Sequence, residues 1–177
     1  MKKSKISTQT KIILLIILVI LLSTIFFTRF FISILLISLT FLLSYILNTL
    51  ELRFVGLELV TFTTVIFGYV YGPWMGGVFG LVLVVIHFII TQSFGGYMVW
   101  VIPEYIAAGV VASIFTSTSI TMIGVAIISV IVLMNILFTT VFYYSNLPKY
   151  IFFAVTNLAF NIFLFLMFGE TVIKLLT

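Results

Sequence analysis

Long apolar runs fill most of this chain, and only eight basic and four acidic residues interrupt them. Hydrophobic residues make up 64% of the sequence and charged residues 7%, whereas soluble domains carry roughly 25% charged residues. A chain with so little polar surface cannot cover a globule in water, and its apolar runs are too long for strands. The sequence therefore predicts an all-α integral membrane protein of a single domain, with no separate soluble domain.

Short polar or glycine- and proline-containing segments divide the apolar sequence into helices. We predict a polytopic helical bundle of six core transmembrane helices plus a short N-terminal helix, Ile12–Thr28, which ends at Arg29. That first run resembles a signal peptide, but a cleavage site is poorly formed around Ser23, so we expect a retained helix. The predicted core helices are Phe30–Leu50, Phe54–Gly72, Trp74–Gln92, Met98–Phe115, Ile120–Phe142 and Tyr150–Phe168. The transmembrane domain then covers residues 12–168, between a basic tail over residues 1–11 and a C-terminal tail over residues 169–177.

The stretch Phe67–Gly80 contains five of the eleven glycines and one of the three prolines. Four of its glycines recur every four residues, and on helices such a stripe lets backbones approach closely. A proline interrupts the stripe, and it disfavours a helical residue before it. We therefore predict two helices joined by a tight turn. The predicted helix-packing residues are Gly68, Gly72, Pro73, Gly76 and Gly80.

Polar residues inside apolar spans are costly and mark functional positions in membrane proteins. Alternation of helix direction places the Gly72-Pro73 turn on one side of the membrane, here named side A. Residues 51–53, 93–97 and 143–149 then fall on the opposite side, side B. Counted inward from side B, polar residues of five helices lie roughly 7–12 Å deep. This layer predicts a pocket for a small polar solute, with site residues Glu58, His87, Gln92, Tyr97, Trp100, Glu104, Asn135, Asn157 and Asn161, and with Tyr105, Tyr143 and Tyr144 as further aromatic walls.

Glu104 is the first candidate in this layer, because it follows Pro103, whose break in the helix can widen a site and free a carbonyl. Other members have simpler interpretations. His87 and Asn135 could serve as interhelical hydrogen-bonding residues. Glu58 and Arg53 lie near enough to side B to be solvated.

Catalytic chemistry finds little support in the sequence. There is one histidine, no cysteine and no aspartate, and no nucleophile or metal-ligand motif accompanies the glutamates. We therefore expect a protein that is not an enzyme and that holds no metal or cofactor.

Four of the eight basic residues are Lys2, Lys3, Lys5 and Lys11. Such a juxtamembrane cluster indicates membrane orientation and contact with lipid headgroups, and no nucleic-acid site.

Two segments resemble the substrate-binding S components of energy-coupling-factor vitamin transporters. Leu57–Gly80, with its Gly68-x-x-x-Gly72-Pro73-x-x-Gly76 turn, resembles the second and third helices of that family. Val99–Val110, which contains Trp100, Pro103 and Glu104, resembles the fourth helix, and the similarity runs over roughly residues 30–168. The resemblance implies six helices in the plasma membrane, and a pocket for a water-soluble vitamin or precursor that opens to the outside under the loops after the first and third helices. It also implies a transmembrane coupling partner and two ATP-hydrolysing subunits.

On that resemblance side B is extracellular and side A cytoplasmic. A separate helix over Ile12–Thr28 would then place the lysine-rich tail outside the cell, against the positive-inside rule. The family's first helix also carries an Ala-x-x-x-Ala-like stripe that docks on the coupling partner, and here Phe30–Leu50 offers only Ser33, Ser38 and bulky neighbours.

Two other functions stay open from the sequence. The chain could be a small polytopic membrane scaffold of the rod-shape-determining type, in which the polar layer holds helices together. It could also be a proton-coupled carrier that uses Glu58 and Glu104 as its relay.

Overall fold

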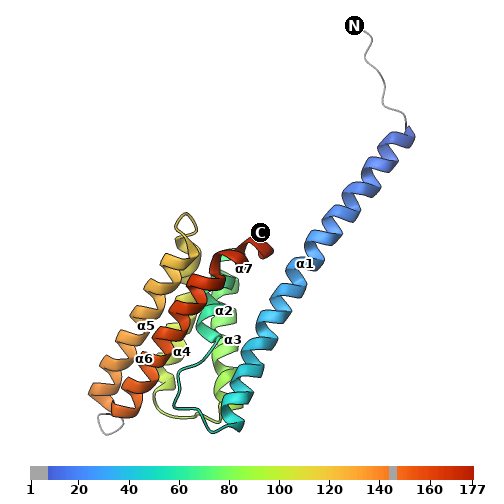
Figure 1. Ribbon diagram of the computed structural model, residues 1–177. Coiled ribbons are helices and arrows are strands. Elements are labelled where there is room, and N and C mark those ends of the chain that lie inside the picture. Colours follow the sequence, from blue (N-terminus) through green and yellow to red (C-terminus); the bar gives the residue numbers. More distant parts are fainter. Residues whose placement is uncertain (1–7, 144–146) are drawn as a thin grey trace.

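The computed structural model describes residues 8–143 and 147–177, and the regular secondary structure within these ranges is helical (Figure 1). The elements are α1 (Thr8–Thr49), α2 (Val60–Tyr71), α3 (Pro73–Thr91), α4 (Met98–Ile114), α5 (Ile120–Phe142) and α6 (Leu147–Leu164), followed by a π-helical turn (Phe165–Gly169) and α7 (Glu170–Leu176). The end of α1 and the start of α6 lie at one end of the bundle, and the C-terminus and the start of α5 lie at the other. These two ends correspond to sides B and A.

Within the described residues, four helical segments are long and apolar enough to cross a membrane: Leu14–Thr49, Pro73–Thr91, Ile120–Phe142 and Leu147–Leu176. Helices α2 and α4 are apolar but shorter. The chain is thus a helical membrane protein, as the long apolar runs predict. The predicted limits of the fifth core helix, Ile120–Phe142, are those of α5.

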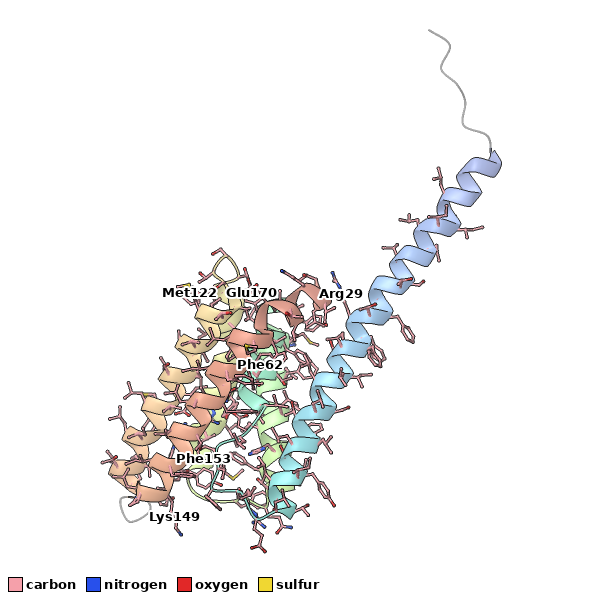
Figure 2. The ribbon with its side chains drawn as sticks, in the orientation of Figure 1. Arg29, Phe62, Met122, Lys149, Phe153 and Glu170 are labelled. Atoms are coloured by element: carbon pink, nitrogen blue, oxygen red, sulfur yellow. The ribbon has the colours of Figure 1, made fainter. Side chains whose placement is uncertain are left out.

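The predicted boundary at Arg29 is wrong, because α1 continues through this residue as one helix of 42 residues. Residues 8–49 contain neither glycine nor proline, so nothing in the backbone stops the helix. The guanidinium of Arg29 donates a hydrogen bond to the carbonyl of Thr177, at the level of side A (Figure 2). The start of α1 therefore lies toward side A, whereas two separate helices would have placed it on side B. Residues 1–7 of the basic tail lie outside the described residues.

Helix α1 is longer than a membrane is thick. The apolar segment Leu14–Thr49 has 36 residues, or about 54 Å at the helical rise, against a hydrocarbon core of about 30 Å. Its N-terminal half extends away from the other helices (Figure 1), and large apolar side chains such as Phe26 and Phe27 are exposed there. The C-terminal half packs against α3, α2 and α7.

Hydroxyl groups fix the C-terminal half of α1 to the bundle. Ser33 Oγ lies 2.8 Å from Tyr71 Oη, and Thr40 Oγ1 lies 2.9 Å from Thr63 Oγ1. Both α1 hydroxyls also bond to backbone carbonyls of their own helix, which satisfies them inside an apolar environment. Ser33 therefore faces the bundle, whereas Ser38 is exposed.

Glycines bring α2, α3 and α4 into direct backbone contact. A methyl group added at Gly68 or Gly76 would overlap the carbonyl oxygen of Gly109, and one added at Gly80 would overlap the carbonyl of Tyr105. Only residues without a side chain allow helix axes this close. Gly109 of α4 is the partner glycine that the predicted stripe did not include.

Gly72 has a different role from the other glycines of the predicted stripe. Nothing lies within 4 Å of a methyl group added there, so it makes no close packing contact. Its φ of 89° and ψ of 178° are instead almost restricted to glycine. Gly72 thereby allows α2 to end at Tyr71 and α3 to start at Pro73, which occupies the first helical position with its fixed φ.

The predicted start of the second core helix at Phe54 is wrong. Helix α2 begins at Val60, and the segment 50–59 is an irregular connection. Besides an internal backbone bond from Val55 N–H to the carbonyl of Leu52, this connection is bonded to α6, since Gly56 N–H donates to Thr156 Oγ1 at 2.9 Å. At the other terminus, residues 170–176 of the predicted tail form α7, with Ile173 and Leu176 buried.

We predict that Gly76→Ala destabilises the protein, although alanine is the better helix former. The added methyl group would overlap both Gly109 and Gly68 backbones. Overpacking of this kind costs about 2 kcal/mol, which corresponds to a fall in Tm of roughly 6 °C in detergent solution.

Gly77→Ala is the matched control on the same helix. Its methyl group would meet the side-chain methyl of Val110 at 3.2 Å, which can shift, so we expect a Tm at or above that of the wild type. Equal Tm values for the two variants would contradict the proposed backbone contact.

Candidate binding site

A cavity of about 510 Å³ lies toward side B, between the connection 50–59 and the B-side ends of the helices. We call it the B-side cavity. Every helix from α1 to α6 except α2 contributes to its wall, and so do the connections before α2 and before α4. The predicted site residues that line it are Glu58, His87, Tyr97, Asn135 and Asn157, together with Tyr105 and Tyr143.

Glu58 is the most heavily hydrogen-bonded member of the site, and only 3% of its surface is exposed. Its Oε1 accepts hydrogen bonds from Thr61 Oγ1 at 2.6 Å, from Tyr105 Oη at 3.2 Å and from Asn157 Nδ2 at 3.1 Å. Its Oε2 accepts from the backbone N–H of Thr61 at 3.0 Å, which caps the first turn of α2. Glu58 thus ties together α2, α4 and α6.

Asn161 lies one turn beyond Asn157 on α6 and is fully buried. Its Nδ2 approaches Glu58 Oε1 at 3.4 Å, and its Oδ1 has no hydrogen-bond partner among the described residues. It supports the Glu58 network from beneath the B-side cavity and does not line the cavity itself.

His87 lies near the end of α3, and Tyr97 directly precedes α4. His87 Nδ1 lies 2.8 Å from Ser44 Oγ, which fixes the imidazole against α1. Tyr97 Oη donates to the carbonyl of Ser93 at 2.5 Å, and this hydrogen bond joins the two ends of the short connection between α3 and α4. Burial raises the pKa of the Tyr97 phenol above its ordinary value, and the bond to Ser93 offsets part of this effect. The phenol is therefore neutral and polar at physiological pH.

Glu104, Asn135 and Trp100 form a second network, between α4 and α5. Asn135 Nδ2 donates to Glu104 Oε2 at 2.7 Å, and Trp100 Nε1 donates to Asn135 Oδ1 at 3.1 Å. Asn135 also reaches the B-side cavity, whereas Glu104 and Trp100 do not line it. Glu104 instead lies at an apolar groove of about 350 Å³ along α4 and α5, and its Oε1 is buried without a hydrogen-bond partner in the described part of the chain.

Gln92 is exposed and ends α3 in a left-handed conformation, with φ of 52°, away from the B-side cavity. Tyr144 lies outside the described residues. The structure therefore brings five of the nine predicted site residues to one cavity, and it joins Asn161, Glu104 and Trp100 to that cavity only through hydrogen bonds to its wall.

The predicted site left out two cationic residues, a serine and several aromatic side chains, although the sequence analysis did place Arg53 near side B. Arg53 and Lys149 line the B-side cavity, and both are exposed. Ser44 lies behind His87. Phe88, Tyr150 and Phe153 complete an aromatic wall with Tyr97, in which neighbouring ring centroids are 5.7–6.4 Å apart. Lys149 lies in the first turn of α6, so the same depth count from side B would have found it as well.

The arrangement is suited to binding a small molecule. The volume falls in the range of small-ligand pockets, and aromatic side chains with a few polar groups on rigid helices are typical linings. In the described residues no group of three or more His, Cys, Asp or Glu side chains is placed to hold a metal ion.

Comparison of the chain with protein-family models, with curated proteins and with solved structures finds no match.

We predict that Glu58→Ala strongly destabilises the bundle, because Tyr105, Asn157 and the N–H of Thr61 would lose their shared acceptor. Donors left unpaired in a buried site cost about 3 kcal/mol together, or a fall in Tm of roughly 6–12 °C in detergent. Glu58→Gln should fall between this variant and the wild type, since the amide keeps one oxygen acceptor.

The control is Glu170→Ala, which removes an exposed carboxyl group on side A. We expect its Tm to stay within about 2 °C of the wild type. A Glu58→Ala protein as stable as this control would show that the network contributes nothing to folding.

Proposed function

We propose that this protein is a membrane substrate-binding subunit, which captures a small water-soluble solute such as a vitamin or its precursor for uptake. The observation that carries the proposal is the B-side cavity of about 510 Å³, where side chains from separate helices present imidazole, amide and phenol groups between aromatic walls. A solute bound there would be largely enclosed by rigid helices, which favours high affinity.

The distribution of basic residues supports a cavity that faces outward. Lys11 and Arg29 lie on the part of α1 that leads away from side B, and Lys174 lies on α7 at side A. Side B carries Arg53 and Lys149. Since cytoplasmic segments are enriched in lysine and arginine, this bias together with the lysines of residues 1–5 favours a cytoplasmic side A. In this orientation, the continuous α1 removes the conflict with the positive-inside rule.

Energy for uptake would come from a transmembrane coupling subunit and an ATPase pair in the plasma membrane. This part of the proposal is supported by the resemblance of Leu57–Gly80 and Val99–Val110 to the S components. Capture on side B would be followed by reorientation of the bundle and release on side A.

The contacts inside the bundle give less support to the two rival functions, a scaffold and a proton-coupled carrier. A scaffold that uses the glycine stripe for its partners would need Gly68, Gly76 and Gly80 exposed, and these glycines are occupied by α4. A proton relay from Glu58 to Glu104 would need the two carboxyl groups in one hydrogen-bond chain. They belong to separate networks, around Asn157 and around Asn135.

We predict that one compound class in a panel of water-soluble vitamins and precursors stabilises the detergent-purified protein. A ligand at 100 times its Kd adds about 2.7 kcal/mol to the unfolding free energy, or roughly 5–11 °C in Tm. Phe153→Ala should remove most of this shift, because Phe153 belongs to the aromatic wall of the cavity.

Phe163→Ala is the matched control, since it changes an exposed phenylalanine of the same helix. It should keep the full ligand shift. A flat response of a well-folded sample across the whole panel would contradict the proposed function and favour a scaffold.

A further inference from the structure

We propose that the ligand of the B-side cavity is an anion with a flat, largely apolar body, and that its carboxylate or phosphate group binds at the mouth between Arg53 and Lys149. This inference rests on the proposed function and adds the chemical class of the solute. It follows from how charge and aromatic rings are distributed along the cavity.

The two cations at the mouth are free to take a ligand. Arg53 comes from the connection before α2 and Lys149 from the first turn of α6, and both line the cavity. Figure 2 shows Lys149 at the side B end of the bundle. Among the described residues, neither side chain is engaged in a hydrogen bond or ion pair. Arginine and lysine offer five and three N–H donors, which match carboxylate and phosphate oxygens.

The acidic group of the lining does not call for a cationic ligand. Glu58 is the carboxyl group that borders the cavity in the described structure, and Thr61, Tyr105 and Asn157 already direct their donors to it. These donors come from three helices and satisfy its oxygen acceptors without a ligand. A cationic solute in the cavity would also be repelled by Arg53 and Lys149 of the same lining.

The aromatic part of the lining is suited to a planar apolar body. Phe88 contacts Tyr97, Tyr97 contacts Tyr150, and Tyr150 contacts Phe153, with the first two pairs edge to face. The lining also contains aliphatic side chains, among them Val84 and Ile131. Aromatic rings pack favourably against such edges and faces, so the wall selects flat solutes over flexible ones.

The test uses matched compounds that differ in charge. Binding of nicotinate, pyridoxal 5′-phosphate, riboflavin 5′-phosphate and biotin is compared with that of their uncharged counterparts nicotinamide, pyridoxine, riboflavin and biotinamide by titration of the purified full chain, and thiamine is added as an unpaired cation. We expect the tightest binder to be an anion, its uncharged counterpart to bind at least tenfold more weakly, and its Kd to rise with salt concentration. Arg53→Gln and Lys149→Gln should each raise that Kd by about fivefold.

Lys174→Gln is the control, because it removes the same charge from an exposed position on side A and should leave Kd unchanged. The inference would be overturned if an uncharged or cationic compound bound most tightly. It would also be overturned if the Kd of the best anion were unchanged in both Arg53→Gln and Lys149→Gln. Either result would leave the proposed function standing. No binding by any compound in the set would overturn both.

Discussion

The close contact of α2, α3 and α4 at Gly68, Gly76 and Gly109 is the constraint on which the rest of the bundle depends. In a membrane, apolar side chains gain little by leaving lipid for one another, so helices associate through tight packing and hydrogen bonds. The three glycines lie in the A-side halves of their helices, where the backbones touch. Toward side B, α3 carries His87, α4 carries Tyr105, and Tyr97 directly precedes α4. Helices joined closely at one end and separated by large side chains at the other leave a cavity where the B-side cavity is found.

The buried polar groups then keep that cavity in one shape. A carboxyl group in a membrane protein is tolerated only where donors surround it, and Glu58 receives donors from α2, α4 and α6. Because Glu58 precedes α2, the same bonds hold the connection 50–59 over the cavity. Gly56 adds to this, since its N–H and carbonyl are both bonded to α6. The connection 50–59 is thus hydrogen-bonded to the cavity wall that it covers. Loss of the Glu58 carboxyl group would therefore leave several donors of that wall without an acceptor.

The sequence predicted the class of the fold and the end of the bundle toward which the B-side cavity lies. It failed where the direction in which a residue points around its helix decides its contacts. Apolar runs and the Gly72-Pro73 dipeptide define the main helices, and a depth count selects the polar layer. The depth count does not tell toward which neighbouring helix a side chain points. It therefore grouped Glu104 with Glu58, although the two carboxyl groups belong to different hydrogen-bond networks. The continuity of α1 was missed because one arginine looked like a boundary, yet a lone charge does not break a helix. The late start of α2 was missed because Phe54 and Val55 are as apolar as the helix that follows.

The length of α1 connects the architecture to the orientation of the molecule. Its C-terminal half is already as long as a membrane is thick and is fixed to the bundle by Ser33, Thr40 and Ser44. The apolar N-terminal half must therefore tilt or bend to stay in contact with lipid, or be covered by another protein surface. In each of these cases the N-terminal half of α1 begins from side A of the bundle, because the helix is continuous and ends at Thr49 on side B. Arg29 of α1 and the B-side cavity thus lie toward opposite ends of the bundle, so the membrane face at which Arg29 lies fixes the direction in which the cavity opens.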